Sequence, residues 1–447
     1  MKCLYERLLI SKVSDVLWKS ESIGSLDVDR LIRALDGFDP MVWYGKRVAI
    51  GEMSAIEFVA TLVFLDGLAQ SIVLLPAEGD QDIQETRMAD DGIDIIIKND
   101  GLGFARLLAQ SDNKMIAHHK IIDRPTAIQT TWLLPTSGTT GTPKLIPHTF
   151  TSLTRSIRTR QIGNEYIWGS LYSLRRFAGL QVFFQSWMCG TPLILNEEKS
   201  DLCNLMNGFI DLGCNALSAT PSMWRKLAMH PLFERLKLRQ ITLGGEIVDQ
   251  AVLDILAKQF PAARITHIYA STEAGVGFAV RDGLAGFPSE YLIQSQLGTA
   301  MRIDDQNHLW FHSPSNYSLA MSSEADWIDS GDVVELKDNR VRFLGRANGS
   351  INVGGNKVMP EEIESVIKGL PDVAFVQVRA RKSAILGSLV EAAIAPMPGV
   401  VIDAAFKKRV TEHCRARLEG FKIPAFIVAS EAVQLTSSGK LSRINVE

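Results

Sequence analysis

Short apolar runs alternate with amphipathic stretches along most of the chain. Runs at 47–50, 72–75 and 93–97 are aliphatic and bounded by turn residues, which predicts buried strands. The same pattern predicts strands at 131–134, 192–195, 215–219, 241–243 and 265–269, and helices at 54–68, 149–160, 178–189, 221–228 and 249–259. Residues 1–40 are predicted to be helical with a polar face. This alternation of strands and helices favours an α/β fold with mostly parallel sheets.

The pattern changes after about residue 295. Short strands are predicted at 301–303, 309–312, 333–336 and 341–344, joined by turns such as 337–339, which is typical of an antiparallel part. Beyond Arg346 the chain predicts a small α+β unit with helices at 361–368 and 404–418, the second capped by Asp403 and ended by Gly420. We therefore expect a large N-terminal domain, 1–347, and a small C-terminal domain, 348–447.

Composition and charge exclude several classes of protein. The 447 residues are 46% hydrophobic and 22% charged, as in an ordinary soluble protein, and the net charge of −3 argues against binding to nucleic acid or an anionic membrane. The N-terminus does not resemble a signal peptide, and no apolar run is long enough to span a membrane. Five scattered cysteines without metal-ligand spacing indicate reduced thiols, so a cytoplasmic protein is expected.

The stretch 134–144, LPTSGTTGTPK, is the first candidate for chemistry. It follows an apolar strand and offers hydroxyl groups, backbone N–H groups and one lysine to an anion such as a di- or triphosphate. It is not a Walker A loop, because Pro143 precedes the lysine. A Gly- and Thr-rich surface turn is the alternative. The candidate phosphate-binding residues are Thr136, Ser137, Gly138, Thr139, Thr140, Gly141 and Lys144.

Further motifs follow in a fixed order along the chain. They are GGE at 244–246, YASTE at 269–273, SGD at 330–332 with Arg346 after it, and TSSGK at 436–440. Together with the loop they resemble the adenylate-forming superfamily, which contains acyl- and aryl-CoA synthetases, adenylation domains of peptide synthetases, and luciferase. The compact chain is similar in size to the o-succinylbenzoate–CoA ligases.

This resemblance implies an ATP site. By resemblance, Gly244, Gly245 and Glu246 form the adenine-binding turn, although a strand-to-helix turn that needs positive φ explains the glycines equally well. Tyr269, Ala270 and Ser271 belong to the next motif, in which the tyrosine stacks near the adenine and Ala270 replaces the usual glycine. Thr272 would approach the α-phosphate or the substrate carboxylate, and Glu273 would bind Mg²⁺.

The remaining implied roles lie nearer the C-terminus. Asp332 would accept hydrogen bonds from the ribose hydroxyls, and Arg346 would reach the ribose or a phosphate. By resemblance Lys440 is the catalytic lysine, Gly354 and Gly355 border the tunnel for the pantetheine thiol, and Asn348 is the hinge. Relatives usually have Asp or Lys at the hinge. An ordinary turn aspartate and solvated basic side chains are the structural alternatives for these positions.

The acid substrate is less well defined by the sequence. Residues 171–180, LYSLRRFAGL, lack the aspartate with which amino-acid-activating relatives bind the α-amine. Arg175 or Arg176 could pair with an anionic substrate or with a phosphate of the thiol partner, or both could be surface residues. Phe177, Phe183, Phe184 and Trp187 with Gly179 could line an aryl or acyl pocket or belong to the core. The candidate pocket residues are Arg176, Phe177 and Gly179.

The resemblance thus implies an AMP-forming acid–thiol ligase that uses ATP, Mg²⁺ and CoA, favours an aryl or medium-chain acid, and works in secondary metabolism. Two alternatives remain open. The acceptor could be the phosphopantetheine arm of a stand-alone carrier protein, or the chain could be a nucleotide sensor without turnover. Arg379–Arg381 could contact a CoA phosphate or an acidic carrier protein, or form a solvated face. Neither a nucleic acid nor a membrane is an expected partner.

Overall fold

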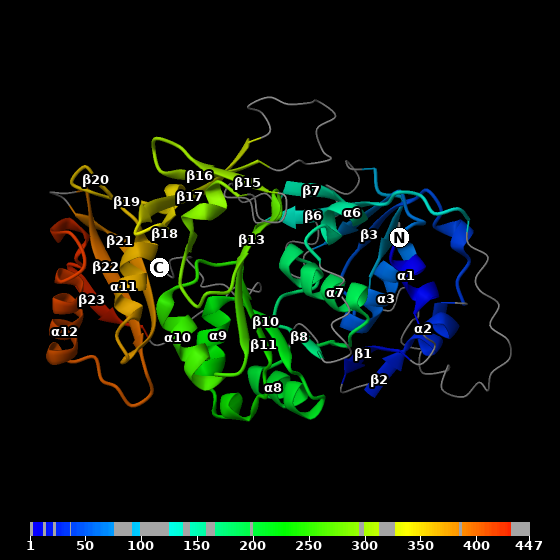
Figure 1. The fold of residues 1–447 in the computed structure, drawn as a ribbon, viewed down its shortest axis with the longest axis horizontal. Helices are drawn as coiled ribbons and strands as arrows, with labels where there is room; N and C mark the ends of the chain where they lie inside the picture. The colour runs from blue at the N-terminus through cyan, green and yellow to red at the C-terminus, as the bar shows by residue number, and fades with distance from the viewer. Residues whose placement is uncertain are drawn as a thin grey trace. The chain divides into compact units, whose positions relative to one another are not determined.

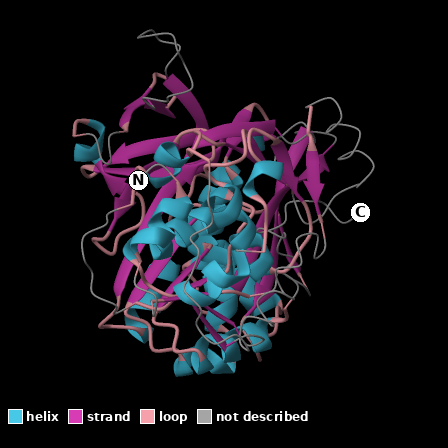
Figure 2. Ribbon diagram, turned by 90° about the vertical axis from the view of Figure 1, so that its right-hand side faces the viewer, coloured by secondary structure: helices cyan, strands magenta, loops and turns pink. Residues whose placement is uncertain are grey.

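The computed structural model describes residues 3–11, 15–20, 24–35, 37–75, 92–98, 125–136, 144–157, 166–196, 200–294, 299–312, 327–383 and 387–430 (Figure 1). They form two compact units, Met1–Ser218 with Arg235–Arg239 and Ala219–Glu234 with Gln240–Glu447. Both units contain helices and strands. Figure 2 colours the helices cyan and the strands magenta. This division does not test the domain boundary expected between residues 347 and 348, which stays a prediction.

The first unit contains a five-stranded sheet in the order β5-β3-β4-β6-β7. Four strands are parallel: β5 (Ile95–Ile97), β3 (Arg47–Ile50), β4 (Ser71–Leu74) and β6 (Thr131–Thr136). Helix α3 (Ala55–Leu65) follows β3, and all of its 11 residues are buried, which fits its almost wholly apolar sequence. A capping box between Ser54 and Glu57 begins this helix.

Strand β7 (Lys144–Thr149) closes this sheet antiparallel to β6, in a stretch for which no strand was predicted. Its Pro147 has no N–H to donate, which an edge strand tolerates. The helix predicted at 149–160 is wrong in length within the described residues, because α6 spans only Phe150–Thr154. Thr149 ends the strand and caps α6 by accepting a hydrogen bond from the N–H of Ser152.

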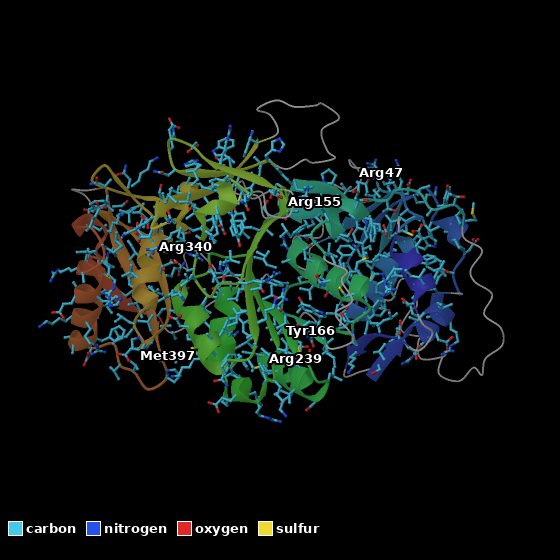
Figure 3. The ribbon with its side chains drawn as sticks, viewed as in Figure 1. Arg47, Arg155, Tyr166, Arg239, Arg340 and Met397 are labelled. Carbon is cyan, nitrogen blue, oxygen red and sulfur yellow. The ribbon has the colours of Figure 1, made fainter. Side chains whose placement is uncertain are left out.

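The first unit also contains the strands β10 (Ala216–Ala219), β8 (Trp168–Ser170), β9 (Leu193–Ile194), β1 (Val16–Ser20) and β2 (Gly24–Asp27), in that order. Its further helices are α1 (Leu4–Ile10), α2 (Val28–Leu35), α7 (Phe177–Cys189) and α8 (Leu202–Asp211), with the 3-10 turn η1 (Pro40–Val42). The 3-10 turn η2 (Pro231–Arg235) belongs to the second unit except for Arg235. Arg239 lies over the ring of Tyr166, with its Cζ 6.0 Å from the centroid (Figure 3).

The prediction that residues 1–40 are helical is wrong for 16–20 and 24–27, which are strands. β1 pairs in parallel with β9, and the ring of Trp18 stacks on that of Trp187 at 5.7 Å. These partners are distant in sequence, so local propensity did not reveal them. Helix α1 is present and is held by Asp66, whose carboxylate accepts from the N–H of Leu4 at 2.8 Å.

In the second unit, β11 (Gln240–Gly244) runs parallel to β12 (Arg264–Ser271), which pairs antiparallel with β13 (Gly275–Val280). Helix α9 (Pro221–Ala228) precedes β11, and α10 (Gln250–Gln259) connects β11 to β12. An antiparallel sheet follows in the order β14-β18-β17-β16-β15. Its strands are β14 (Phe287–Pro288), β15 (Ala300–Ile303), β16 (His308–His312), β17 (Trp327–Lys337) and β18 (Arg340–Arg346), with η3 (Ser289–Leu292) after β14.

The hairpin between β17 and β18 turns at Asp338 and Asn339, whose φ angles of 52° and 58° suit a tight two-residue connection. Arg340 then joins this sheet to the 282–286 loop, because it pairs with the carboxylate of Asp282 at 2.8 Å and donates to three backbone carbonyls there (Figure 3). The prediction of antiparallel strands after residue 295 is therefore confirmed.

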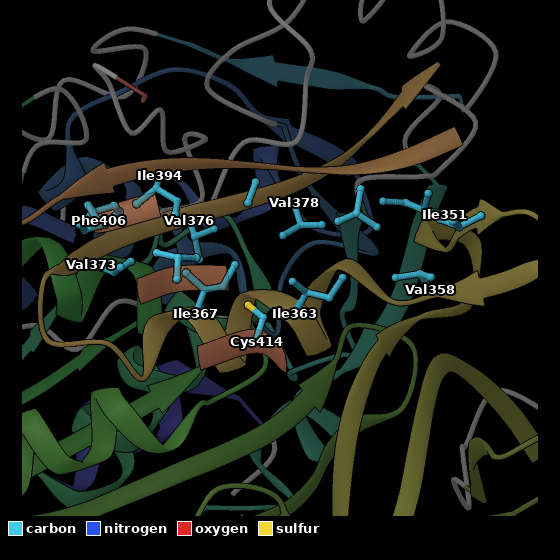
Figure 4. Packing of buried hydrophobic residues seen from close by; sticks show 14 residues of the cluster. Ile351, Val358, Ile363, Ile367, Val373, Val376, Val378, Ile394, Phe406 and Cys414 are labelled. Carbon is cyan, nitrogen blue, oxygen red and sulfur yellow. The ribbon is translucent and has the colours of Figure 1, made fainter. Parts of the chain in front are cut away.

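The C-terminal part of this unit begins with η5 (Ala347–Gly349) and the hairpin β19 (Ile351–Val353)–β20 (Asn356–Val358). A three-stranded sheet follows, made of β21 (Val373–Ser383), β22 (Gly387–Pro396) and β23 (Phe426–Ala429), with η6 (Gly420–Lys422) before the last strand. Helices α11 (Pro360–Lys368) and α12 (Ala404–Arg415) pack on this sheet around Ile363, Ile367, Val376, Phe406 and Cys414 (Figure 4).

The α+β character of this part is as predicted. Asp403 caps α12 by accepting from the N–H of Phe406 at 2.7 Å, but the helix ends at Arg415 and not at the predicted 418. The fold class is thus confirmed: parallel α/β sheets, an antiparallel β part and an α+β C-terminal part. Within the residues that the structure describes, no helix is long and apolar enough to cross a membrane.

Candidate active site

The candidate phosphate loop joins two paired strands. Thr136 ends β6 and lies opposite Lys144, the first residue of β7, and the Thr136 hydroxyl donates to the Lys144 carbonyl at 3.4 Å. Lys144 is exposed, so its ammonium is open to an anion. The loop thus leaves the carboxyl end of a parallel strand, the usual position of ligand sites in α/β sheets. Ser137, Gly138, Thr139, Thr140 and Gly141 lie outside the described residues.

The GGE motif forms the turn that follows β11. Gly244 is the last residue of the strand, and Gly245 has φ +80°, which confirms the need for positive φ at this turn. The carboxylate of Glu246 accepts a hydrogen bond from the N–H of Ser222 at 2.9 Å, in the first turn of α9. The structure therefore gives Glu246 a role in holding this turn against α9, while its part in adenine binding stays a prediction.

A buried ion pair joins α9 to the start of α10. The guanidinium of Arg225 in α9 pairs with the carboxylate of Asp249, and the two side chains are 5% and 6% exposed. Asp249 also caps α10 by accepting from the N–H of Val252 at 3.1 Å, and Lys368 of α11 lies 4.0 Å from its second oxygen. This ion pair was not predicted from the sequence. An aspartate at the start of a predicted helix indicates a helix cap, but nothing in the local sequence indicated Arg225 as its partner.

The YASTE motif ends in a tight hairpin turn. Ser271, the last residue of β12, lies opposite Gly275, whose φ is +73°, and the Ser271 hydroxyl accepts from the N–H of Ala274. Thr272 and Glu273 therefore occupy the tip, and Glu273 is exposed. A single exposed carboxylate suits Mg²⁺, which takes most of its other ligands from phosphates and water. Among the described residues, no group of three His, Cys, Asp or Glu side chains is placed to hold a metal alone.

Tyr269 contacts Asp332 and lies in a cluster of aromatic rings. Its hydroxyl donates to Oδ2 of Asp332 at 2.5 Å, and its ring lies nearly parallel to those of Phe278, Phe311 and Phe343 at centroid distances of 5.3, 5.0 and 5.3 Å. Burial and the neighbouring Asp332 carboxylate hold the pKa of Tyr269 well above its usual value. Stacking of this ring on an adenine stays a prediction.

Asp332 is a buried carboxylate that pairs with Arg346 across the β17–β18 hairpin. Its residue is 3% exposed, and its Oδ1 lies 2.8 Å from Nε of Arg346, the residue directly opposite it. Arg346 also donates to the Ser330 carbonyl, and its side chain is 56% exposed. Burial raises the pKa of Asp332, whereas Arg346 and the Tyr269 hydroxyl oppose that rise.

The segment 171–180 contributes mainly to the core. Arg175 is only 4% exposed and donates to the carbonyls of Ile50 and Leu75, so the surface interpretation is wrong for this residue, while pairing with an anionic substrate or phosphate stays a prediction. Gly179 is required by packing, because a Cβ there would meet the Ser173 carbonyl oxygen at 2.1 Å. Phe177 is buried against His148, while Arg176 is half-buried and donates to the Pro135 carbonyl at 3.4 Å.

The other aromatic candidates lie in the core. Phe183 stacks on Trp187 at 5.8 Å, and Phe184 packs edge-on to Trp132 at 5.6 Å. All four side chains are buried. The interpretation of Phe183, Phe184 and Trp187 as core residues is therefore confirmed. Arg176 and Phe177 are the remaining side chains of the proposed substrate pocket.

The C-terminal candidates differ in their surroundings. Gly354 and Gly355 form the exposed two-residue turn of the β19–β20 hairpin with φ angles of +56° and +91°. Asn348 is exposed within η5. Arg379 and Arg381 both pair with the buried carboxylate of Glu391, at 2.5 and 3.0 Å. Lys440 lies outside the described residues.

Comparison with known proteins identifies the family. The model of the AMP-binding enzyme family matches residues 59–307, and that of the AMP-binding enzyme C-terminal domain matches residues 362–440. The chain therefore belongs to the AMP-binding enzyme family, the adenylate-forming superfamily that its motifs resemble. In class it is an AMP-forming ligase.

Its relatives are distant. Surfactin synthase subunit 1 of Bacillus subtilis is 27% identical over 364 residues, which cover 70% of this chain but 10% of that protein. A 2-succinylbenzoate–CoA ligase of Listeria innocua is 25% identical over 339 residues, which cover 70% of this chain and 69% of that protein. The fold resembles that of the anthranilate CoA ligase AuaEII in complex with anthranoyl-AMP, with TM-score 0.79, 16% identity, and coverage of 98% of this chain and 94% of that one.

Proposed function

We propose that this protein activates a carboxylic acid with ATP to an acyl-adenylate, releases pyrophosphate, and transfers the acyl group to the thiol of CoA. Family membership supports the adenylation step. The structural observation that carries the proposal is Asp332, a buried carboxylate held by Arg346 on one oxygen and Tyr269 on the other. A preorganised acceptor of this kind suits the ribose diol of a nucleotide.

The nucleotide would be bound by groups of different chemistry. Lys144 and the loop 137–143 bind the phosphates that leave, because this segment offers a cation and many hydrogen-bond donors. The turn at 244–246 lies against the purine, and Asp332 and Arg346 bind the ribose. Glu273 would hold Mg²⁺ from the tip of the β12–β13 turn, and the bound ion would neutralise charge on the phosphate oxygens.

The chemistry proceeds by two substitutions. An oxygen of the carboxylate attacks the α-phosphorus, and the bond to the bridging oxygen of pyrophosphate breaks. The thiol sulfur then attacks the acyl carbon, AMP leaves with the electron pair of the broken C–O bond, and the thiol proton is lost. Thr272 and Lys440 position and neutralise the α-phosphate and carboxylate oxygens in the first step, so the protein contributes mainly orientation and electrostatics.

The second step needs a change of access to the adenylate. We assign the hinge to Asn348, with a small domain of 348–447 that carries Lys440 away and brings Gly354 and Gly355 to the path of the thiol. Asn348 is exposed within a short 3-10 turn, a position at which a hinge residue can change its backbone angles. Asparagine also tolerates unusual backbone angles better than most residues.

We favour an aryl or medium-chain acid over an α-amino acid. No aspartate occurs in 171–180 to bind an α-amine, and one relative is named for an aryl acid, 2-succinylbenzoate. Arg176 is half-buried beside Pro135 and is the remaining cation of that segment for an acid with a second negative charge. Its neighbour Phe177 offers an aromatic surface.

A pyrophosphate-release screen over aryl, fatty and amino acids tests this function, followed by addition of CoA or of a carrier protein bearing phosphopantetheine. Release with an aryl or fatty acid and acylation of CoA is the expected result. Acylation of the carrier alone would favour the first alternative, which the match to surfactin synthase supports. ATP binding without pyrophosphate release from any acid would favour a nucleotide sensor.

A further inference from the structure

We propose that Tyr269 is a positioning residue for Asp332, and that its hydroxyl orients this carboxylate for the ribose diol. The inference rests on the proposed function, since it takes Asp332 as the ribose acceptor. It differs from the role that the motif implies, in which the tyrosine ring stacks on the purine. The two roles differ in what they require of the hydroxyl. Orienting Asp332 needs it, whereas stacking of the ring does not.

The Asp332 carboxylate has more acceptor positions than Arg346 and Tyr269 use. An ionised carboxylate has about four lone-pair positions, two on each oxygen. The guanidinium of Arg346 pairs with Oδ1, from which its Nε lies 2.8 Å away, and the Tyr269 hydroxyl donates to Oδ2 at 2.5 Å. One position on each oxygen is left for the two hydroxyls of a ribose, so the two protein donors orient the carboxylate and leave its other positions for the ligand.

The packing around Tyr269 fixes the position of its hydroxyl. The Tyr269 ring lies within 5.3 Å of the rings of Phe278, Phe311 and Phe343, which come from three different strands. Gly277 allows this arrangement, because a Cβ at that position would meet the Phe311 ring at 2.7 Å. A ring packed in this way holds its hydroxyl in one place, whereas the Arg346 side chain is 56% exposed and is therefore less enclosed by the protein.

Charged groups around Asp332 affect its ionisation. Glu361 and Asp329 are negative groups near Asp332 and disfavour its ionised form, as burial does. Arg346 and the Tyr269 hydroxyl are the groups that oppose them. A charge-assisted hydrogen bond from Tyr269 therefore helps to keep Asp332 both ionised and oriented, and an ionised carboxylate is the form that accepts from two hydroxyls.

The test compares Tyr269→Phe with the wild type on ATP and on 2′,3′-dideoxy-ATP, in pyrophosphate release and in direct calorimetric binding. We expect the KM and Kd for ATP to rise about tenfold with kcat little changed, because the ribose is remote from the reacting phosphorus. The same constants for dideoxy-ATP should not change. Tyr291→Phe is the matched control, since Tyr291 packs on Phe278 and Phe287 in the same cluster, and it should behave as the wild type.

A second variant separates positioning from general damage. In Asp332→Asn the preference for ATP over dideoxy-ATP should fall, and adding Tyr269→Phe should cause no further loss, because both changes act on one interaction. Tyr269→Phe with an unchanged preference for ATP would overturn the positioning role alone. A wild type that binds ATP and dideoxy-ATP equally well would overturn the ribose role of Asp332 and this inference with it, and a wild type that binds no ATP would overturn the proposed function itself.

Discussion

The carboxylate of Glu246 accepts a hydrogen bond from the backbone N–H of Ser222 at 2.9 Å, and so joins the turn after β11 to the start of α9. The first turn of α9 has its donors satisfied in three ways. Pro221 has no N–H, Glu246 accepts from Ser222, and the Thr220 hydroxyl accepts from Met223 at 3.1 Å. A residue from the candidate adenine-binding turn thus completes the cap of a neighbouring helix.

This contact predicts the effect of two substitutions at Glu246. Glu246→Ala leaves the Ser222 N–H without its acceptor and should lower the free energy of unfolding by about 1–2 kcal/mol. Glu246→Gln retains an acceptor oxygen and should cost less. Urea denaturation of both variants measures the difference, and equal losses would show that the hydrogen bond does not contribute as stated.

Glu273 is predicted to act through the metal ion. Glu273→Ala removes an exposed carboxylate at the tip of a turn, so it should leave stability within about 0.5 kcal/mol of the wild type. Adenylation should weaken, with a higher Mg²⁺ concentration needed for half-maximal pyrophosphate release. Glu290→Ala, on the short helix η3, is the control that changes the net charge equally. An unchanged magnesium dependence in Glu273→Ala would remove this residue from the site.

Lys440 is predicted to serve only the first half-reaction. Lys440→Ala should abolish pyrophosphate release from acid and ATP, because charge on the α-phosphate and carboxylate oxygens is no longer neutralised. Thioester formation from a supplied acyl-adenylate should be nearly unchanged. Both rates can be followed in one preparation with CoA as acceptor. Equal loss of the two steps would contradict the assigned role.

His267 is predicted to make stability depend on pH. Burial lowers the pKa of this imidazole below its usual 6.5, against the effects of Asp282 and of the Leu284 carbonyl, which accepts from its Nε2–H at 3.0 Å, while Arg340 reinforces the lowering. Between pH 6.5 and the lower pKa of the folded state, the unfolded chain binds a proton at this ring that the folded chain does not bind, so stability is lost as the pH falls across this range, and the loss is complete below the folded pKa.

His267→Gln should therefore show a shallower loss of stability on the acid side of neutrality than the wild type. Denaturant unfolding at several pH values between 5 and 8 measures this slope. The variant loses a packed ring, so its absolute stability is expected to be lower at every pH. Parallel curves for the two proteins would show that His267 does not carry the pH dependence.

The sequence by itself determined the family, the fold class and the list of motif residues. Parallel strands such as β3 and helices such as α9 were predictable, because their apolar spacing and their Pro or capping residues are local signals. The motifs were readable for the same reason, since each is a short contiguous run. The glycine needed at Gly245 and the hairpin at Asp338 and Asn339 also follow from local backbone requirements.

Only the tertiary structure decided what each of those residues contacts. β1 depends on β9 and on the stacking of Trp18 on Trp187, and Arg175 is buried because two carbonyls from distant strands accept its hydrogen bonds. The contact of Tyr269 with Asp332 joins residues 63 positions apart. Hydrogen bonds and ion pairs depend on the three-dimensional positions of their partners, and no periodicity along one chain encodes them.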